Sequence, residues 1–113
     1  MKRHKYGAIP TTVDNIRFDS KAEARRYGEL KLLEKAGEIS HLQLQPVFLL
    51  CVEPREPDAP AITIGKYVAD FRYRLRNHVL IVEDVKGVKT ALYRWKRKHV
   101  EAQYGITITE IHS

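Results

Sequence analysis

Residues 66–86 constrain the fold more than any other part of the chain. Lys66 to Leu75 is a β-prone run in which apolar and polar residues alternate from Asp70 onward, and a second β-prone run extends from Val79 to Lys86. The short polar segment Arg76-Asn77-His78 separates the two runs. Alternation of this kind indicates strands, and the polar segment indicates a turn between them. We therefore expect two adjacent strands, and the apolar opening of the second is typical of burial on both faces.

If these strands pair antiparallel, the turn brings two acidic residues level with each other. Asp70 and Asp84 each lie seven positions from Asn77, one before it and one after it. Alternate residues of a strand share a face, so Lys86 projects on the same side as Asp84, while Glu83 points the other way. Two carboxylates and one ammonium group are then expected to converge at one point of the sheet.

Such a convergence destabilises a fold unless a partner neutralises it, because adjacent carboxylates repel and neither is stable near a core alone. A divalent cation resolves the conflict, since Mg²⁺ prefers oxygen ligands and usually takes one or two carboxylates. A bound cation polarises a phosphoryl oxygen, and a neighbouring lysine can orient water. These groups suit phosphodiester hydrolysis. Taken singly, Asp70 can equally be a strand-end residue, and Asp84 with Lys86 a weak surface ion pair.

A helix is expected before these strands, and its first turn carries a third acid. Asp19-Ser20 opens the helix, which runs to about Ala36 and stops at Gly37. Ser20 and Glu23 match the capping-box pattern S-x-x-E. Glu23 also lies in line with Leu30 on the helix, at the edge of the apolar stripe, where it can face the sheet. The sequence leaves both roles open for Glu23, helix cap and member of the carboxylate cluster.

The remaining pattern predicts a mixed α/β domain that spans residues 1–113. A small hairpin over residues 10–18 turns at Asp14-Asn15, and residues 39–50 are β-rich with a bulge or edge position at Pro46. A loop with three prolines follows at residues 53–61. A second helix is expected from Thr90 to Gly105, and a last strand over residues 106–111. The order is hairpin, α, β, β, β, α, β, which predicts a central mixed sheet flanked by helices.

The charge of the chain favours a polyanionic partner. The 113 residues carry 20 Lys and Arg against 14 Asp and Glu, a net charge of +6. Residues 86–99 hold six of the basic residues and no acid. No stretch approaches the roughly 20 apolar residues of a membrane helix, and no signal-peptide core follows the basic N-terminus. The single cysteine, Cys51, excludes an internal disulfide, which fits a reducing cytoplasm.

These residues resemble the PD-(D/E)xK nuclease superfamily, whose core order is α-β-β-β-α-β. The resemblance is closer to a phage and prophage family of small uncharacterised proteins within that superfamily. The matching stretches are Lys5-Tyr6-Gly7, Phe18 to Tyr27, Leu44-Gln45-Pro46, Tyr67 to Phe71, Val82 to Gly87, Lys89-Thr90, Tyr93 and Tyr104-Gly105. They cover nearly the whole chain. The resemblance implies a restriction-endonuclease-like fold.

The resemblance also implies roles for individual residues. Asp70 and Asp84 would ligate Mg²⁺ or Mn²⁺, helped by the Val85 carbonyl. Lys86 would position or activate the attacking water. Glu23 would complete the metal site or hold a water.

Two further positions bear on the resemblance. Gln45 occupies a place where related nucleases often keep a polar residue beside the site. The residue before Asp70 is Ala69, where the superfamily name has proline. That proline is often absent, so the departure weakens the resemblance only slightly.

Basic residues near the metal strand and on the first helix are expected to contact phosphates, which holds nucleic acid without reading its sequence. These residues are Arg25, Arg26, Lys89, Arg94, Lys96, Arg97 and Lys98. Tyr93 and Trp95 could stack on bases, but their helical spacing favours the core. Cys51 is expected to be a small buried apolar residue. The following histidines show no metal-ligand spacing and are expected at the surface: His41, His78 and His99.

The function predicted from these patterns is metal-dependent cleavage of nucleic acid by a phage-type DNA endonuclease. The small size favours nicking or structure-selective cutting of branched or nicked DNA over sequence-specific restriction. A homodimer would supply two sites for two strands, and we expect a phage- or prophage-encoded protein in the host cytoplasm, with no membrane partner. The alternative is a non-catalytic DNA- or RNA-binding module on the same fold. A ribosome-associated protein would explain the charge but not the clustered acids.

Overall fold

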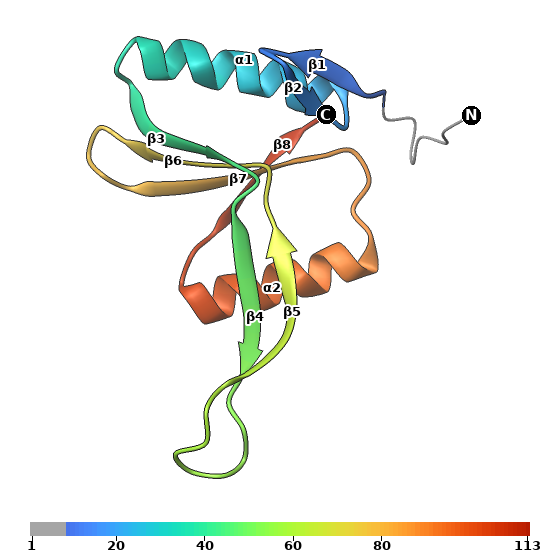
Figure 1. Ribbon diagram of the computed structural model, residues 1–113, viewed down its shortest axis with the longest axis vertical. Helices are drawn as coiled ribbons and strands as arrows, with labels where there is room; N and C mark the ends of the chain where they lie inside the picture. The colour runs from blue at the N-terminus through green and yellow to red at the C-terminus, as the bar shows by residue number, and fades with distance from the viewer. Residues whose placement is uncertain (1–8) are drawn as a thin grey trace.

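The computed structural model describes residues 9–113, which form two helices and eight strands (Figure 1). The predicted mixed α/β class is confirmed. The elements in chain order are β1 (Thr11–Val13), β2 (Ile16–Phe18), α1 (Lys21–Lys35), β3 (Ile39–Leu44), β4 (Val47–Val52), β5 (Ile62–Val68), β6 (Phe71–Leu75), β7 (Leu80–Lys86), α2 (Ala91–Tyr104) and β8 (Ile108–His112). The matching stretch Lys5-Tyr6-Gly7 lies outside the described residues.

The central sheet has four strands in the order β3-β6-β7-β8. β3 and β7 run antiparallel to β6, whereas β8 runs parallel to β7. Phe71 pairs with Glu83, and the Asp70 N–H donates to the Glu83 carbonyl at 3.1 Å. This register continues to place Asp70 level with Asp84. The predicted hairpin and its register about Asn77 are therefore confirmed.

The two long strands that the sequence predicts at residues 39–50 and 66–75 are each divided in two. The first breaks at Gln45-Pro46 and the second at Ala69-Asp70. Pro46 has no N–H for a sheet ladder, which accounts for the first break. β4 and β5 then pair only with each other and form a ribbon that leaves the central sheet and lies against α2 (Figure 1).

Two backbone hydrogen bonds hold the bends together. The Gln45 N–H donates to the Asp70 carbonyl at 2.9 Å, and the Ala69 N–H donates to the Pro46 carbonyl at 3.1 Å. The bend that carries Asp70 is thereby fixed to the bend of the neighbouring strand. Since Asp70 is a candidate ligand, the position of its backbone is set by these bonds as well as by the sheet.

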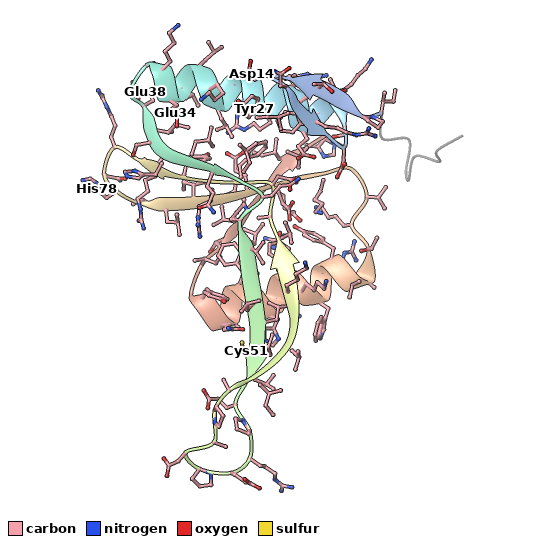
Figure 2. All side chains as sticks on the ribbon, viewed as in Figure 1. Asp14, Tyr27, Glu34, Glu38, Cys51 and His78 are labelled. Carbon is pink, nitrogen blue, oxygen red and sulfur yellow. The ribbon has the colours of Figure 1, made fainter. Side chains whose placement is uncertain are left out.

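Two apolar cores lie on opposite faces of the central sheet. The core beneath α1 contains Phe18, Ala24, Tyr27, Leu30, Ile39, Phe71 and Tyr73. The core beneath α2 contains Phe48, Leu50, Tyr67, Ala69, Val82, Tyr93, Val100 and Ile108. In Figure 2, Tyr27 points from α1 toward the β1-β2 hairpin, where its hydroxyl donates to Asp14 at 3.1 Å. β7 therefore contributes to both cores and is buried on both faces, as predicted.

The ends of both helices follow the predicted signals. The Ser20 hydroxyl accepts from the Glu23 N–H at 3.1 Å, and the Thr90 hydroxyl accepts from the Tyr93 N–H at 3.1 Å. α2 closes on Gly105, whose φ of 66° suits glycine. Within residues 9–113, no helix is long and apolar enough to cross a membrane.

Candidate metal centre

Asp70, Asp84 and Lys86 meet where the sheet bends. Asp84 lies on β7, is 1% exposed and accepts a hydrogen bond from the Tyr67 hydroxyl. The Lys86 ammonium lies 3.7 Å from the other Asp84 oxygen, Oδ1. Asp70 accepts a hydrogen bond from the Val85 N–H at 2.6 Å. The predicted convergence of two carboxylates and one ammonium group is present in the structure.

Two carboxyl groups around this bend, those of Asp70 and Glu23, have raised pKa values. Burial raises the pKa of Asp70 to about 8, and the nearby charges of Asp84 and Glu23 add to that rise. Burial likewise raises the pKa of Glu23 to about 7, with further contributions from Asp19 and Asp84. Glu23 is only 6% exposed. It therefore faces the sheet and belongs to the electrostatic neighbourhood of the two aspartates.

Within residues 9–113, no three His, Cys, Asp or Glu side chains are gathered closely enough to form a ready-made metal site. The arrangement instead offers the paired carboxylates of Asp70 and Asp84. Because Mg²⁺ usually binds one or two carboxylates and retains several waters, such a pair is a sufficient protein contribution. A cation here would also relieve the repulsion that raises the pKa of Asp70. The donor set therefore fits Mg²⁺ or Mn²⁺, and ligation by Glu23 or the Val85 carbonyl stays a prediction.

Lys86 is held in place by an aromatic ring. Its ammonium lies 4.4 Å from the centre of the Tyr93 ring, and its side chain is 27% exposed. Tyr93 is fixed in turn by a hydrogen bond of 2.7 Å from its hydroxyl to Glu110. A cation over an aromatic face is attracted to it. The charge of Lys86 is thereby kept beside Asp84 while remaining accessible to solvent.

Gln45 lies next to Asp70 through its backbone, and its side chain is exposed. Its φ of 49° is in the left-handed region, which non-glycine residues adopt rarely. Backbone strain of this kind concentrates at functional sites. The structure thus brings Gln45 to the edge of the candidate centre, as the resemblance implies, and its role there stays a prediction.

Glu83 occupies the opposite face of β7, as its position in the alternation predicts. The Arg26 guanidinium donates two hydrogen bonds, of 2.8 and 2.6 Å, to the Glu83 carboxylate. The Tyr73 hydroxyl donates a third hydrogen bond to the same carboxylate. This cluster joins α1 to β7. Arg26 is therefore not available as the DNA contact predicted from the sequence, because a buried carboxylate holds its charged group. The alternation predicts the face on which Glu83 lies but not its pairing with Arg26.

Two of the predicted phosphate contacts on and before α2 are also engaged within the protein. Lys89 lies 3.0 Å from Glu110, and Arg97 lies 2.9 Å from Glu110 and 3.2 Å from Glu101. The predicted basic contacts with no ion-pair partner among the described residues are Arg25, Arg94, Lys96 and Lys98. These remain available to an anionic partner.

Three expectations about single residues on α2 and β4 are wrong. Trp95 is 52% exposed and is not a core residue, whereas Tyr93 is buried as expected. Cys51 is only half-buried. His99 is partly buried and contacts the Cys51 carbonyl at 3.0 Å. His41 and His78 are exposed, as expected. The spacing of Trp95 does not distinguish the inner face of a helix from the outer one when polar residues flank both.

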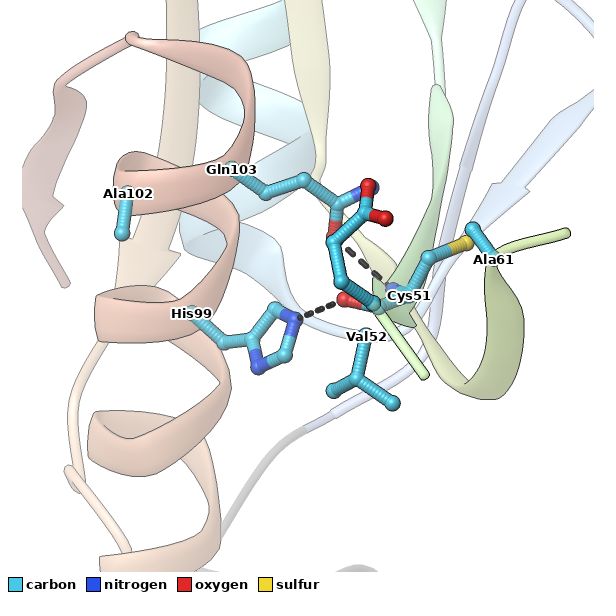
Figure 3. Close-up of a pocket in the computed structure, with 7 residues that line it drawn as sticks. Cys51, Val52, Ala61, His99, Ala102 and Gln103 are labelled. Atoms are coloured by element: carbon cyan, nitrogen blue, oxygen red, sulfur yellow. Dashed lines mark hydrogen bonds between the residues drawn. The ribbon is translucent and has the colours of Figure 1, made fainter. Parts of the chain in front are cut away.

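A pocket of about 490 Å³ between β4 and α2 contains none of the candidate ligands (Figure 3). Its polar groups serve the packing of the helix on the ribbon. The Gln103 side chain accepts from the Cys51 N–H at 2.8 Å and donates to the Leu49 carbonyl at 3.1 Å. His99 contacts the same strand. These bonds satisfy backbone groups of β4 that β5 does not pair, so we interpret the pocket as part of the packing between β4 and α2.

Tyr67 is the residue of the site that the sequence did not indicate. It is buried in the core beneath α2 and reaches Asp84 from the ribbon strand β5. Its contact depends on the bend at Ala69-Asp70, which turns β5 away from the central sheet. The continuous strand that the sequence predicts over residues 66–75 gives no reason to expect the contact between Tyr67 and Asp84.

The family described as "Protein of unknown function (DUF1064)" matches residues 3–111 of the chain. No curated protein and no solved structure matches the chain. The family match spans nearly the whole sequence and includes every residue of the candidate centre. The chain therefore belongs to the DUF1064 family.

Proposed function

We propose that this chain is a metal-dependent phosphodiesterase that cuts DNA internally, acting as a nicking or structure-selective endonuclease. The observation that carries the proposal is the buried pair Asp70 and Asp84, which lies beside Lys86 at the bend of the sheet. A purely structural carboxylate would be expected to have a neutralising partner of its own, but burial and the nearby charge of Asp84 raise the pKa of Asp70. Binding of a divalent cation between the two carboxylates would explain why they lie side by side.

In this proposal, Asp70 and Asp84 hold Mg²⁺ or Mn²⁺, and Glu23 holds a water or completes the ligand set. When bound, the cation supplies polarisation of a phosphoryl oxygen and acidification of water. The chain itself contributes the orientation of the carboxylates. The Val85 N–H fixes one oxygen of Asp70, and the Tyr67 hydroxyl fixes one oxygen of Asp84. Each aspartate then presents its other oxygen in a defined direction.

Lys86 has two tasks in the proposed reaction. Its ammonium orients the attacking water, and it screens the charge that develops on the scissile phosphate. The ammonium lies 4.4 Å from the centre of the Tyr93 ring and 3.7 Å from Asp84. A lysine in a close ion pair would not be free to contact substrate. The longer distance to Asp84 supports a role toward a ligand.

DNA is the proposed partner because cations that have no ion-pair partner within residues 9–113 lie on both helices near the centre. Arg25 lies on α1 near Glu23, and Arg94, Lys96 and Lys98 lie on α2 after the metal strand. Contacts from such residues fix a phosphate backbone without reading bases. The available cations would therefore contact the phosphates and not the base edges. We therefore favour recognition of DNA structure, with a homodimer cutting two strands, in the cytoplasm of a phage-infected or prophage-carrying cell.

A cleavage assay tests the proposal directly. The substrates are supercoiled plasmid, linear duplex, single-stranded DNA, a four-way junction and an RNA strand, each with Mg²⁺, Mn²⁺ or EDTA. We expect cutting that requires metal and is absent in the Asp84→Ala protein. The matched control is Asp58→Asn, an exposed acid in the proline-rich loop, which should cut normally. Salt-sensitive binding without cutting on every substrate would overturn the proposal in favour of a non-catalytic binding module.

A further inference from the structure

Trp95 lies on the outer face of α2 with 52% of its surface exposed, although it is the largest side chain of the protein. It lines a pocket of about 670 Å³ on that face. Successive residues of a helix are about 100° apart, so Trp95 points roughly 200° away from the buried Tyr93. The ring therefore contributes little to the core beneath α2. Its exposure requires an explanation outside the fold.

The charges around Trp95 are positive after internal pairing. The two acids of the pocket, Glu101 and Glu110, are bonded to Arg97 or Lys89 of the same pocket. Arg94 and Lys98 line the pocket beside the ring and have no ion-pair partner among residues 9–113. The result is an aromatic surface set among available cations.

The combination of aromatic ring and cations favours a nucleic acid over a protein as the occupant. The core of a protein interface is depleted in lysine, because burying an ammonium is costly. Leu92, 62% exposed one turn earlier, extends the apolar surface by only one side chain. By contrast, a single nucleic-acid strand offers a flat base for stacking and phosphates for cations. Proteins bind such strands with aromatic platforms in positively charged grooves.

The position of Trp95 relative to the candidate metal centre fits this occupant. Lys86 contacts Tyr93 of the first turn of α2. Trp95 lies two residues later, which is about 3 Å further along the helix axis. A strand that leaves the metal centre and crosses the start of α2 would reach the ring on the other side of the helix. His99, whose ring centre is 5.8 Å from that of Trp95, limits the orientation of the indole.

We propose that Trp95, Arg94 and Lys98 form a subsite for an unpaired nucleotide, in which the indole stacks on the base and the two cations bind the adjacent phosphates. The subsite rests on the proposed function, since it deepens how the same nuclease would select its substrate. It accepts a base only where the duplex is open. Single-stranded, flapped or branched DNA is thereby preferred over a perfect duplex.

Intrinsic fluorescence tests the subsite, because Trp95 is the only tryptophan of the chain. The full-length protein is titrated with a single-stranded oligothymidylate and with a blunt duplex, both in EDTA so that no cutting occurs. We expect at least twofold quenching by the single strand, at lower concentration than by the duplex. A spectrum that does not respond to the single strand would overturn the subsite.

Variants then separate stacking from general attraction, with binding measured by anisotropy of labelled DNA. Base stacking on an aromatic side chain corresponds to about 1–3 kcal/mol, so Trp95→Ala should weaken single-strand binding roughly 5- to 150-fold. Trp95→Phe should restore most of the affinity. Leu92→Ala is the matched control and should bind normally. Unchanged affinity in Trp95→Ala overturns the subsite.

Two further measurements identify the cause of a failure. If fluorescence depends on protein concentration without DNA, and Trp95→Ala converts a sedimenting dimer to a monomer, the ring belongs to a contact between copies and the subsite is overturned. Cleavage with Mg²⁺ is measured separately. Absence of cutting with intact quenching removes the nuclease assignment and leaves the nucleotide subsite of a binding module.

Discussion

Glu83 and Asp84 are neighbours on β7, and both are 1% exposed, yet they lie in opposite electrostatic surroundings. Glu83 faces α1, where the Arg26 guanidinium grips it with two hydrogen bonds and Tyr73 donates a third. Asp84 faces the other side, where Tyr67 donates one hydrogen bond and the nearest cation, Lys86, is 3.7 Å away. The first carboxylate has two short hydrogen bonds to a guanidinium, whereas the second has one longer ion pair and lies beside another carboxylate.

The partners of a buried carboxylate indicate whether it serves the fold or a function. A carboxylate that accepts two hydrogen bonds from a guanidinium has its hydrogen-bonding capacity met within the protein. Here the pair also helps to hold α1 on β7. A buried carboxylate that lies beside a second one and has few partners lowers the stability of the fold. Such an arrangement is expected to persist only where it serves a function. Burial alone does not distinguish the two. The distinction comes from the partners, and substitutions on either side of β7 should therefore have different effects.

The largest expected effect is on the Asp84 side. Asp84→Asn removes the charge but keeps the size of the side chain, so the Tyr67 contact can persist. Cleavage should fall by at least about 10³-fold, equivalent to about 4 kcal/mol on the barrier. The free energy of unfolding should change by less than about 1 kcal/mol, since the lost repulsion with Asp70 offsets the lost ion pair with Lys86. Residual activity within tenfold of the parent, measured on the best substrate with Mg²⁺, would contradict a role in metal binding.

The Glu83 side should show the reverse pattern. Glu83→Gln leaves Arg26 without its ion pair, and the loss of one partner from a buried pair costs about 3 kcal/mol or more. Urea denaturation should therefore show a much lower midpoint. The matched control is Glu29→Gln, because Glu29 contacts the same Arg26 at 3.8 Å but is 56% exposed. That variant should lose less than about 1 kcal/mol. Equal losses in the two variants would show that burial does not strengthen the Arg26 pair.

The sequence was sufficient to predict the local pattern on β7 but not the partners across it. Alternation and the symmetric position of Asn77 predicted the register that sets Asp70 level with Asp84, and parity placed Glu83 on the other face. These depend on neighbours along the chain and on a short turn. The partners of Glu83 depend instead on how α1 docks, and Arg26 was therefore mistaken for a phosphate contact.

The bends of the sheet limited the prediction in a second way. Pro46 indicated an irregularity, but residues 66–75 were predicted to form one strand, although the apolar run Tyr67-Val68-Ala69 interrupts the alternation directly before the break at Ala69-Asp70. That break carries Tyr67 to Asp84 and directs the β4-β5 ribbon onto α2. The exposure of Trp95 was missed for a similar reason. Its spacing fits an apolar stripe, and only the docking of α2 decides which side of the helix faces the ribbon.

A smaller effect should appear when pH is varied without metal. The pKa of Asp70 is about 8 in the folded protein, against 3.8 for an ordinary aspartate. A raised pKa means that the folded state holds the proton more tightly than the unfolded state, so stability is full below about pH 4 and falls as the pH rises toward 8. In EDTA, unfolding free energy should decline from pH 5 to pH 8. Asp70→Asn should decline less and exceed the parent at pH 8 by at least about 1.4 kcal/mol, the equivalent of one pKa unit.

Metal should reverse this difference. Because a ligand that binds only the folded state stabilises it by mass action, Mg²⁺ at about 100 times its dissociation constant adds about 2.7 kcal/mol. The parent should gain this stability at pH 8, and Asp70→Asn should not. Denaturation curves of the two proteins that run parallel across the pH range, with and without Mg²⁺, would show that the carboxylate pair is not strained.

The smallest stability effect is expected at Glu23, where the two roles that the sequence left open can be separated. The helix cap uses the backbone N–H of residue 23, which the Ser20 hydroxyl accepts at 3.1 Å. Glu23→Gln retains that bond and removes only a carboxylate whose pKa is raised to about 7. Stability should therefore stay within about 1 kcal/mol, while cleavage is abolished. Ser20→Ala is the converse variant, because it should lose about 1 kcal/mol of stability and still cut. Full activity in Glu23→Gln would return Glu23 to a structural role, and the functional side of the strand would then consist of the two aspartates and Lys86 alone.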